Sequence, residues 1–179
     1  MTNIDYKVFQ QYASLVGLSV GVIWLCAFFF SIYGMLTPGL GLAGDLCVVA
    51  APVAGYFRAK KYRDTVLKGS MTFGNALYFL FSVFMYATIL LAAGQFIYFN
   101  YLDHGFLYTT YKDILQQPAY RQMLESMADK NQVSQALEQF RAATYRPISL
   151  VFGFMGFHLV VSFALAFFCA LFLKRSPRY

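Results

Sequence analysis

Long apolar segments alternate with short polar ones along this chain. A helix that crosses the hydrocarbon core of a bilayer needs about 20 apolar residues, at a rise of about 1.5 Å per residue. Four segments meet this requirement, at residues 12–36, 39–57, 73–101 and 147–173. The pattern therefore predicts an all-α integral membrane protein with four transmembrane helices, in which residues 1–179 form a single membrane domain.

The segment between the last two spans, residues 103–146, is too long for a turn. Pro118 suits the first position of a helix. Two apolar stripes at helical spacing follow it, namely Tyr120, Met123, Leu124 and Met127, then Val133, Leu137 and Phe140. This spacing predicts an amphipathic helical segment that covers the bundle, lies on the membrane or binds a partner helix.

The composition excludes an ordinary soluble domain. Hydrophobic residues make up 59% of the chain and charged residues 12%, against roughly 25% charged in a typical soluble protein. Cys26, Cys47 and Cys169 all fall inside predicted spans without paired spacing. We therefore expect neither a disulfide framework nor a metal site, and no cofactor.

Basic residues predict the orientation of the chain. The segment at 103–146 has five basic and five acidic residues, whereas the loop at 58–72 and the two ends carry a basic excess. The basic residues of that second group are Lys7, Arg58, Lys60, Lys61, Arg63, Lys68, Lys174, Arg175 and Arg178. Because Lys and Arg stay on the cytoplasmic side, we expect a multi-pass membrane protein with both termini in the cytoplasm. The orientation of the chain during membrane insertion explains these basic residues, and no nucleic-acid-binding motif accompanies them.

Two titratable side chains, Asp45 and His158, lie inside predicted spans. Such residues are costly in a membrane and mark functional sites by default. The two could meet as a functional pair, or Asp45 could cap a helix that begins at Leu46. Asp103 and His104 end the third span, but no nucleophile or metal motif completes a catalytic group there, so we assign no catalytic residues.

Several glycines are spaced for close packing of helices. Gly17 and Gly21 form a G-x-x-x-G pair, and Gly153 with Gly156 thins one side of the last span. The stretch "GLGLAG" at 39–44 matches a dinucleotide-binding fingerprint, but that motif requires a preceding strand. We interpret these glycines as residues that turn the chain after Pro38 and allow helices to approach.

The stretch "KYRDTVLKGSMTFGNAL" at 61–77 carries a family resemblance. The residues that match are Tyr62, Arg63, Asp64, Gly69, Phe73, Gly74 and Ala76. Together with the four-span plan they resemble the bacterial family called domain of unknown function 4199, seen mainly in Bacteroidetes. The resemblance implies a four-helix inner-membrane protein without an established activity.

We expect a noncatalytic membrane subunit or scaffold that anchors or regulates a membrane enzyme. The proteins that we expect to accompany this family point to an enzyme of lipid-linked sugar metabolism. Tyr62, Arg63 and Asp64, with Lys60 and Lys61, would order the loop into a docking surface for that enzyme or for anionic headgroups. A loop whose charges only orient the chain is the simpler interpretation. The partners are then membrane lipids and either another protein or a second copy. The alternative function is a small transporter or channel protomer that uses Asp45 and His158.

Overall fold

The computed structural model describes residues 6–118, 120, 123 and 130–175. Among these residues the regular structure is helical, in agreement with the predicted all-α class. Two compact units share the chain. The first unit takes the residues up to Ala93 and those from Phe154 onward, and the second takes Gly94–Gly153.

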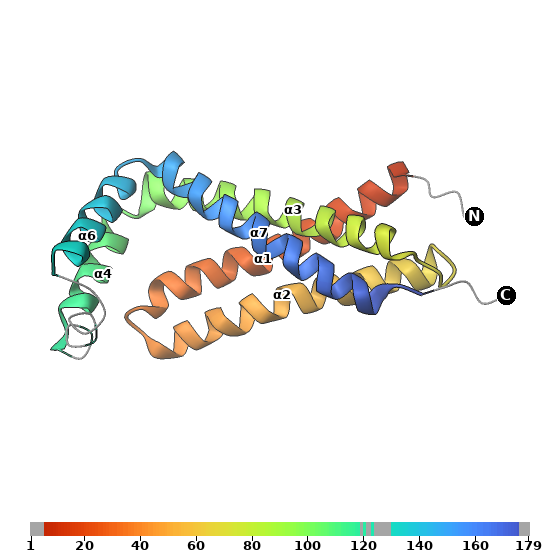
Figure 1. Cartoon of the computed structure of the whole chain (residues 1–179), viewed down its shortest axis with the longest axis horizontal. Helices are drawn as coiled ribbons and strands as arrows, with labels where there is room; N and C mark the ends of the chain where they lie inside the picture. Colours follow the sequence, from red (N-terminus) through yellow and green to blue (C-terminus); the bar gives the residue numbers. More distant parts are fainter. Residues whose placement is uncertain (1–5, 119, 121–122, 124–129, 176–179) are drawn as a thin grey trace. The chain divides into compact units, whose positions relative to one another are not determined.

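Helices α1 (Tyr6–Gly34) and α2 (Pro38–Thr65) form an antiparallel hairpin in the first unit (Figure 1). The chain reverses at 35–37, and Pro38 occupies the first turn of α2. The glycines at 39–44 therefore lie inside α2, and the prediction that they turn the chain is wrong. Gly44 does allow close packing, because a methyl group there would lie 2.9 Å from Ser31 Oγ, whereas one at Gly41 would make an ordinary contact of 3.5 Å with the Gly34 carbonyl oxygen.

Helix α3 (Phe73–Ile97) packs against α1 through the predicted glycine pair. A methyl group at Gly17 would lie 2.7 Å from the Val83 carbonyl oxygen, and one at Gly21 would lie 3.1 Å from the Ala87 Cα atom. Helix α7 (Pro147–Leu173) joins α3 through a buried contact of 3.4 Å between the hydroxyl oxygens of Thr88 and Ser162. The other glycine pair, Gly153 and Gly156, has no atom within 4 Å of an added methyl group, so nothing in the described residues uses it for packing.

Four helices are long and apolar enough to cross a membrane, as the sequence predicts. The last span has the predicted bounds, and the third continues from α3 through a π-helix, η1 (Tyr98–Leu102). The second span differs, because α2 continues as a helix to Thr65 rather than ending at 57. Hydropathy falls where Arg58 begins the charged stretch, but backbone hydrogen bonds of a helix do not require apolar side chains.

The second unit contains α4 (Phe106–Gln116) and α6 (Lys130–Thr144). Asp103 starts α4, because its carboxylate accepts hydrogen bonds from the backbone amides of Gly105 and Leu107, at 3.1 and 3.0 Å. Phe140 of α6 contacts the rings of Tyr108 and Tyr111, with centroids 6.5 and 5.4 Å away. The stripe of Val133, Leu137 and Phe140 thus includes a contact with α4, whereas Leu124 and Met127 of the first stripe lie outside the described residues.

Candidate functional site: the basic end of the first unit and Asp45

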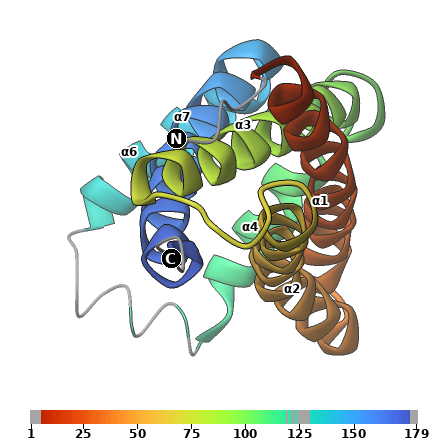
Figure 2. The ribbon, with the colours of Figure 1, turned by 90° about the vertical axis from the view of Figure 1, so that its right-hand side faces the viewer.

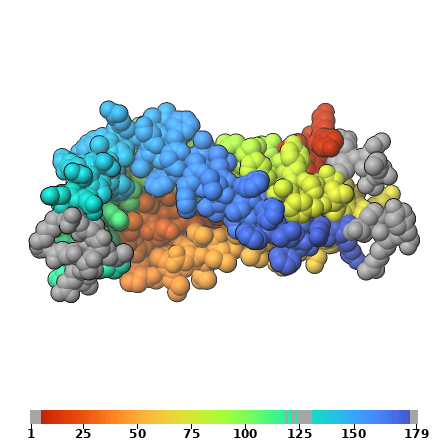
Figure 3. All heavy atoms as spheres, in the orientation of Figure 1, coloured from red at the N-terminus to blue at the C-terminus, as the bar shows by residue number. Residues whose placement is uncertain are grey.

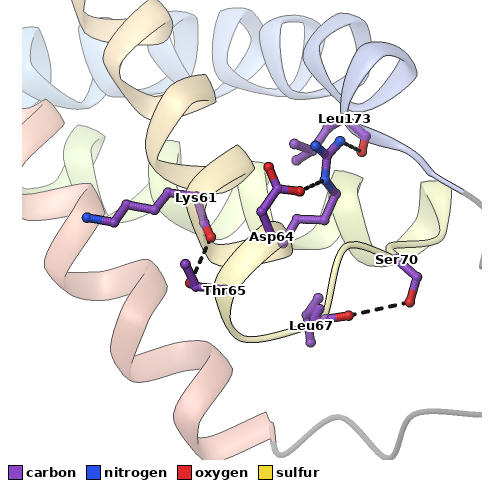
Figure 4. Close-up of polar contacts among 7 residues, drawn as sticks. Lys61, Asp64, Thr65, Leu67, Ser70 and Leu173 are labelled. Carbon is purple, nitrogen blue, oxygen red and sulfur yellow. Dashed lines mark hydrogen bonds and ion pairs between the residues drawn. The ribbon is translucent and has the colours of Figure 1, made fainter.

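Arg63 is a buried cation at the end of α2 where the basic loop begins. Its side chain is 7% exposed. Nε donates to Asp64 Oδ1 at 2.8 Å, and Nη1 donates to the backbone carbonyl of Leu173 at 2.9 Å (Figure 4). Leu173 is the last residue of α7, whose final carbonyls have no partner within the helix. Arg63 therefore supplies a donor to a carbonyl at the end of a helix, 110 residues away in the chain.

The loop after α2 is also tied down through its backbone. The Arg63 carbonyl accepts a hydrogen bond from the Gly69 amide at 2.9 Å. Lys68 and Gly69 take positive φ angles of 52° and 84°, which reverse the chain. Met71 and Arg175 then exchange two backbone hydrogen bonds of 3.0 and 2.9 Å as an isolated antiparallel bridge. Figure 2 shows this loop in yellow, passing from the end of α2 to the start of α3.

These contacts bring two basic segments to the same end of the first unit. We define the basic end by its exposed cations, which are Arg58, Lys60, Lys61, Lys68, Lys174 and Arg175. Asp64 is the acidic side chain among them, and it is 42% exposed. The charge pattern predicted that the cations of the loop and those after α7 lie on one side of the membrane, but it contained no signal for the hydrogen bonds that join the two segments.

Tyr62 lies beneath the basic end in an aromatic cluster, which we define as Phe9, Tyr12, Tyr62 and Phe79. Tyr62 is 1% exposed and stacks on Phe79 with ring centroids 4.8 Å apart and planes at 12°. Phe9 meets its edge at 5.9 Å, and Tyr12 lies at 4.8 Å. The Tyr62 and Arg63 side chains are thus buried, and they stabilise the loop through contacts inside the first unit. Among the predicted docking residues, the exposed ones are Lys60, Lys61 and Asp64.

Asp45 lies in the body of α2, as its eighth residue. The interpretation of Asp45 as the cap of a helix beginning at Leu46 is therefore wrong, since α2 begins two turns earlier. The Asp45 side chain is exposed. No hydrogen bond or ion pair reaches its carboxylate from the residues that the structure describes.

His158 occupies a different environment on α7. Its Nδ1 lies 2.8 Å from the Phe154 carbonyl oxygen of the preceding turn, and its ring meets Trp24 of α1 edge-on at 6.1 Å. The described contacts do not join His158 to Asp45, and the transporter alternative built on both residues stays a prediction.

The neighbours Asp103 and His104 also have distinct surroundings. Asp103 is buried and its two carboxylate oxygens bind the start of α4. His104 is exposed and takes a positive φ of 41° in the turn before that helix. Asp103 thus stabilises a helix start, and among the described residues no group of three His, Cys, Asp or Glu side chains is placed to hold a metal ion.

Neither the curated proteins nor the solved structures gave a match to this chain. A family described as protein of unknown function (DUF4199) matches residues 14–175, which include all four membrane helices for most of their length and the complete basic loop. With four membrane helices and a match over nearly its whole length, the chain belongs to the family of proteins of unknown function DUF4199.

Proposed function

We propose that this protein is a noncatalytic subunit or scaffold of a bacterial inner membrane, which anchors or regulates a membrane enzyme by docking it at the basic end. The observation that supports this most is the buried Arg63, which holds the α2–α3 loop and the end of α7 together. A chain that needed cations only for orientation would not require them on a fixed surface.

The chemistry of the basic end suits an acidic surface on the enzyme. The basic end has six exposed cations and one exposed carboxylate, Asp64, so a partner with carboxylates at the membrane surface would be attracted and oriented. The charges lie on helix ends and on a loop with bonded backbone, which lowers the entropy lost on binding. We place this end in the cytoplasm because the positive charge of the chain is concentrated there. An enzyme of lipid-linked sugar metabolism remains the candidate partner.

The test is purification of the tagged protein from its native host in mild detergent. We expect a membrane enzyme to copurify in near-equal amount with the parent protein. The double substitution Lys60→Glu with Lys61→Glu should remove it, because both side chains are exposed at the basic end. Lys112→Glu changes the charge of an exposed residue in the second unit and serves as the matched control.

Arg63→Lys separates docking from orientation, because it keeps the charge and removes the planar fork that binds two acceptors. Normal insertion with weaker enzyme binding is the expected result. Unchanged copurification in both the Lys60–Lys61 double variant and Arg63→Lys would refute docking at the basic end.

A further inference from the structure

Asp45 lies within the part of α2 that crosses the membrane. Arg58 marks the start of the basic end on the same helix, and Asp45 precedes it by about 20 Å at about 1.5 Å per residue. The hydrocarbon core is about 30 Å thick. With Arg58 at one boundary, the Asp45 carboxylate therefore lies inside the core, about 10 Å from the opposite boundary.

The face of α2 beside Asp45 is apolar and exposed. Leu42, Leu46, Val49 and Val53 follow one another at helical spacing, with exposed fractions of 63, 64, 64 and 47%. Asp45 neighbours Leu42 and Val49 on the helix surface, because residues three and four apart lie side by side. Small residues on another face of α2, such as Gly44 and Gly55, pack within the first unit. Figure 3 shows the first half of α2, in orange, at the surface of the molecule.

A cation on a neighbouring helix would stabilise a carboxylate in this position. Ionisable side chains in membrane helices are rare, and they pair with one another or line a path through the protein. We propose that the exposed face of α2 binds a membrane helix of another protein, and that this helix carries a Lys or Arg at the depth of Asp45. This inference rests on the proposed function for the existence of a protein partner, and it adds the chemistry of the contact within the membrane.

A second copy of this chain fits the site poorly. The sequence has no Lys or Arg in residues 8–57, 69–102 or 147–173, so another copy brings no cation to the depth of Asp45. Two copies related by a twofold axis would place two carboxylates together, which repel one another. His158 is already placed against Trp24 and the Phe154 carbonyl of its own chain. A cationic helix from a different protein pairs with the charge without these costs.

The test uses two synthetic helix peptides and the full-length protein in phosphatidylcholine vesicles. Each peptide has a 20-residue core of Leu and Ala between Trp residues. One peptide has Lys at the eighth core position and the other has Leu there. The protein carries one dye on Gln135→Cys, an exposed position, with the native cysteines replaced, and energy transfer to a labelled peptide reports association.

We expect the Lys peptide to bind the parent protein about tenfold more tightly than the Leu peptide. Asp45→Leu should bring this ratio close to one, whereas Asp45→Glu should keep most of it. Because the Asp45 side chain is exposed, neither substitution removes a contact of the fold. Lys68→Gln with Lys174→Gln changes two exposed cations of the basic end outside α2, and this control should leave the ratio unchanged, which separates the contact at Asp45 from the basic end.

Two results would overturn the inference. Equal binding of the two peptides to the parent protein would show that Asp45 does not select a cation, and this measurement requires no variant. Energy transfer between two labelled copies of the protein that disappears in Asp45→Leu would make a second copy the occupant. In either case, retained copurification of an enzyme would leave the proposed function standing.

Discussion

Removal of the Arg63 side chain should open the contact between the α2–α3 loop and the end of α7. Arg63→Ala deletes the donor to the Leu173 carbonyl, a buried bond of 2.9 Å. A hydrogen bond to a charged group contributes about 1.5–3 kcal/mol, and a buried carbonyl left without a donor incurs a similar cost. The ion pair with Asp64 is exposed on the acidic side, so we count only the bond to Leu173. A loss of about 2 kcal/mol corresponds to a roughly 30-fold larger open population.

Hydrogen exchange of the amides of Met71 and Arg175 measures this opening, because both amides donate in the bridge between the two segments. In detergent-solubilised protein their exchange should accelerate by about tenfold or more in Arg63→Ala. Arg63→Lys should fall between the parent and Arg63→Ala, since one ammonium group cannot reproduce the planar fork. The Leu107 amide in the second unit, which Asp103 binds, is the internal control.

An acceleration below about threefold at Met71 and Arg175 would refute the assignment, since it corresponds to well under 1 kcal/mol. Equal acceleration at Leu107 would point to a loss of global stability rather than local opening.

Single cysteines at Lys61 and Gln135 should react with a membrane-impermeant reagent from opposite sides of the intact membrane, and reaction from the same side would contradict the four-span topology. Gly17→Ala should lower the thermal stability of the solubilised protein by about 1–3 kcal/mol, because its methyl group would press on α3. Gly39→Ala is the matched control, which meets open space in a helix and should be neutral or stabilising; equal effects would argue against close packing at Gly17. Asp103→Ala should cost about 1 kcal/mol, because it removes the carboxylate that binds the first amides of α4, and it should accelerate hydrogen exchange of the Leu107 amide. Unchanged exchange of that amide would refute this role.

The membrane helices were predictable because bilayer thickness imposes a minimum length on apolar segments. The prediction of 147–173 coincides with α7, whose first residue is a proline and whose last precedes two cations. Hydropathy located the end of α2 less well, because the helix extends past the membrane boundary to Thr65. The prediction that Asp45 caps a helix was wrong for a related reason. Glycines 39–44 suggested a turn before Asp45, whereas the helix already begins at Pro38.

The partner of Arg63 was not predictable. The sequence around it indicated a shaped loop, because Tyr62 and Asp64 are unnecessary for orientation alone. Its acceptor, however, is a backbone carbonyl 110 residues later, and every residue type presents the same carbonyl. The sequence likewise contains no signal that predicts the bridge between Met71 and Arg175. Contacts of this kind depend on how helices of known length meet, which hydropathy does not specify.

The two proposed contacts lie along one helix, and this restricts the partner further. Phe57 and Lys60 continue the exposed stripe of Leu42, Leu46, Val49 and Val53, because they follow Val53 by four and seven residues. A single partner could therefore run along α2 from the membrane interior to the basic end. Such a partner needs a membrane helix with a buried cation and an acidic surface where that helix leaves the membrane on the side of the basic end. Its charges would be the reverse of those on α2, where the acid is inside the membrane and the cations are at the boundary. Simultaneous Asp45→Lys and Lys60→Glu should then weaken enzyme copurification more than either substitution alone, and an effect no larger than that of Lys60→Glu would show that the enzyme does not contact the membrane part of α2.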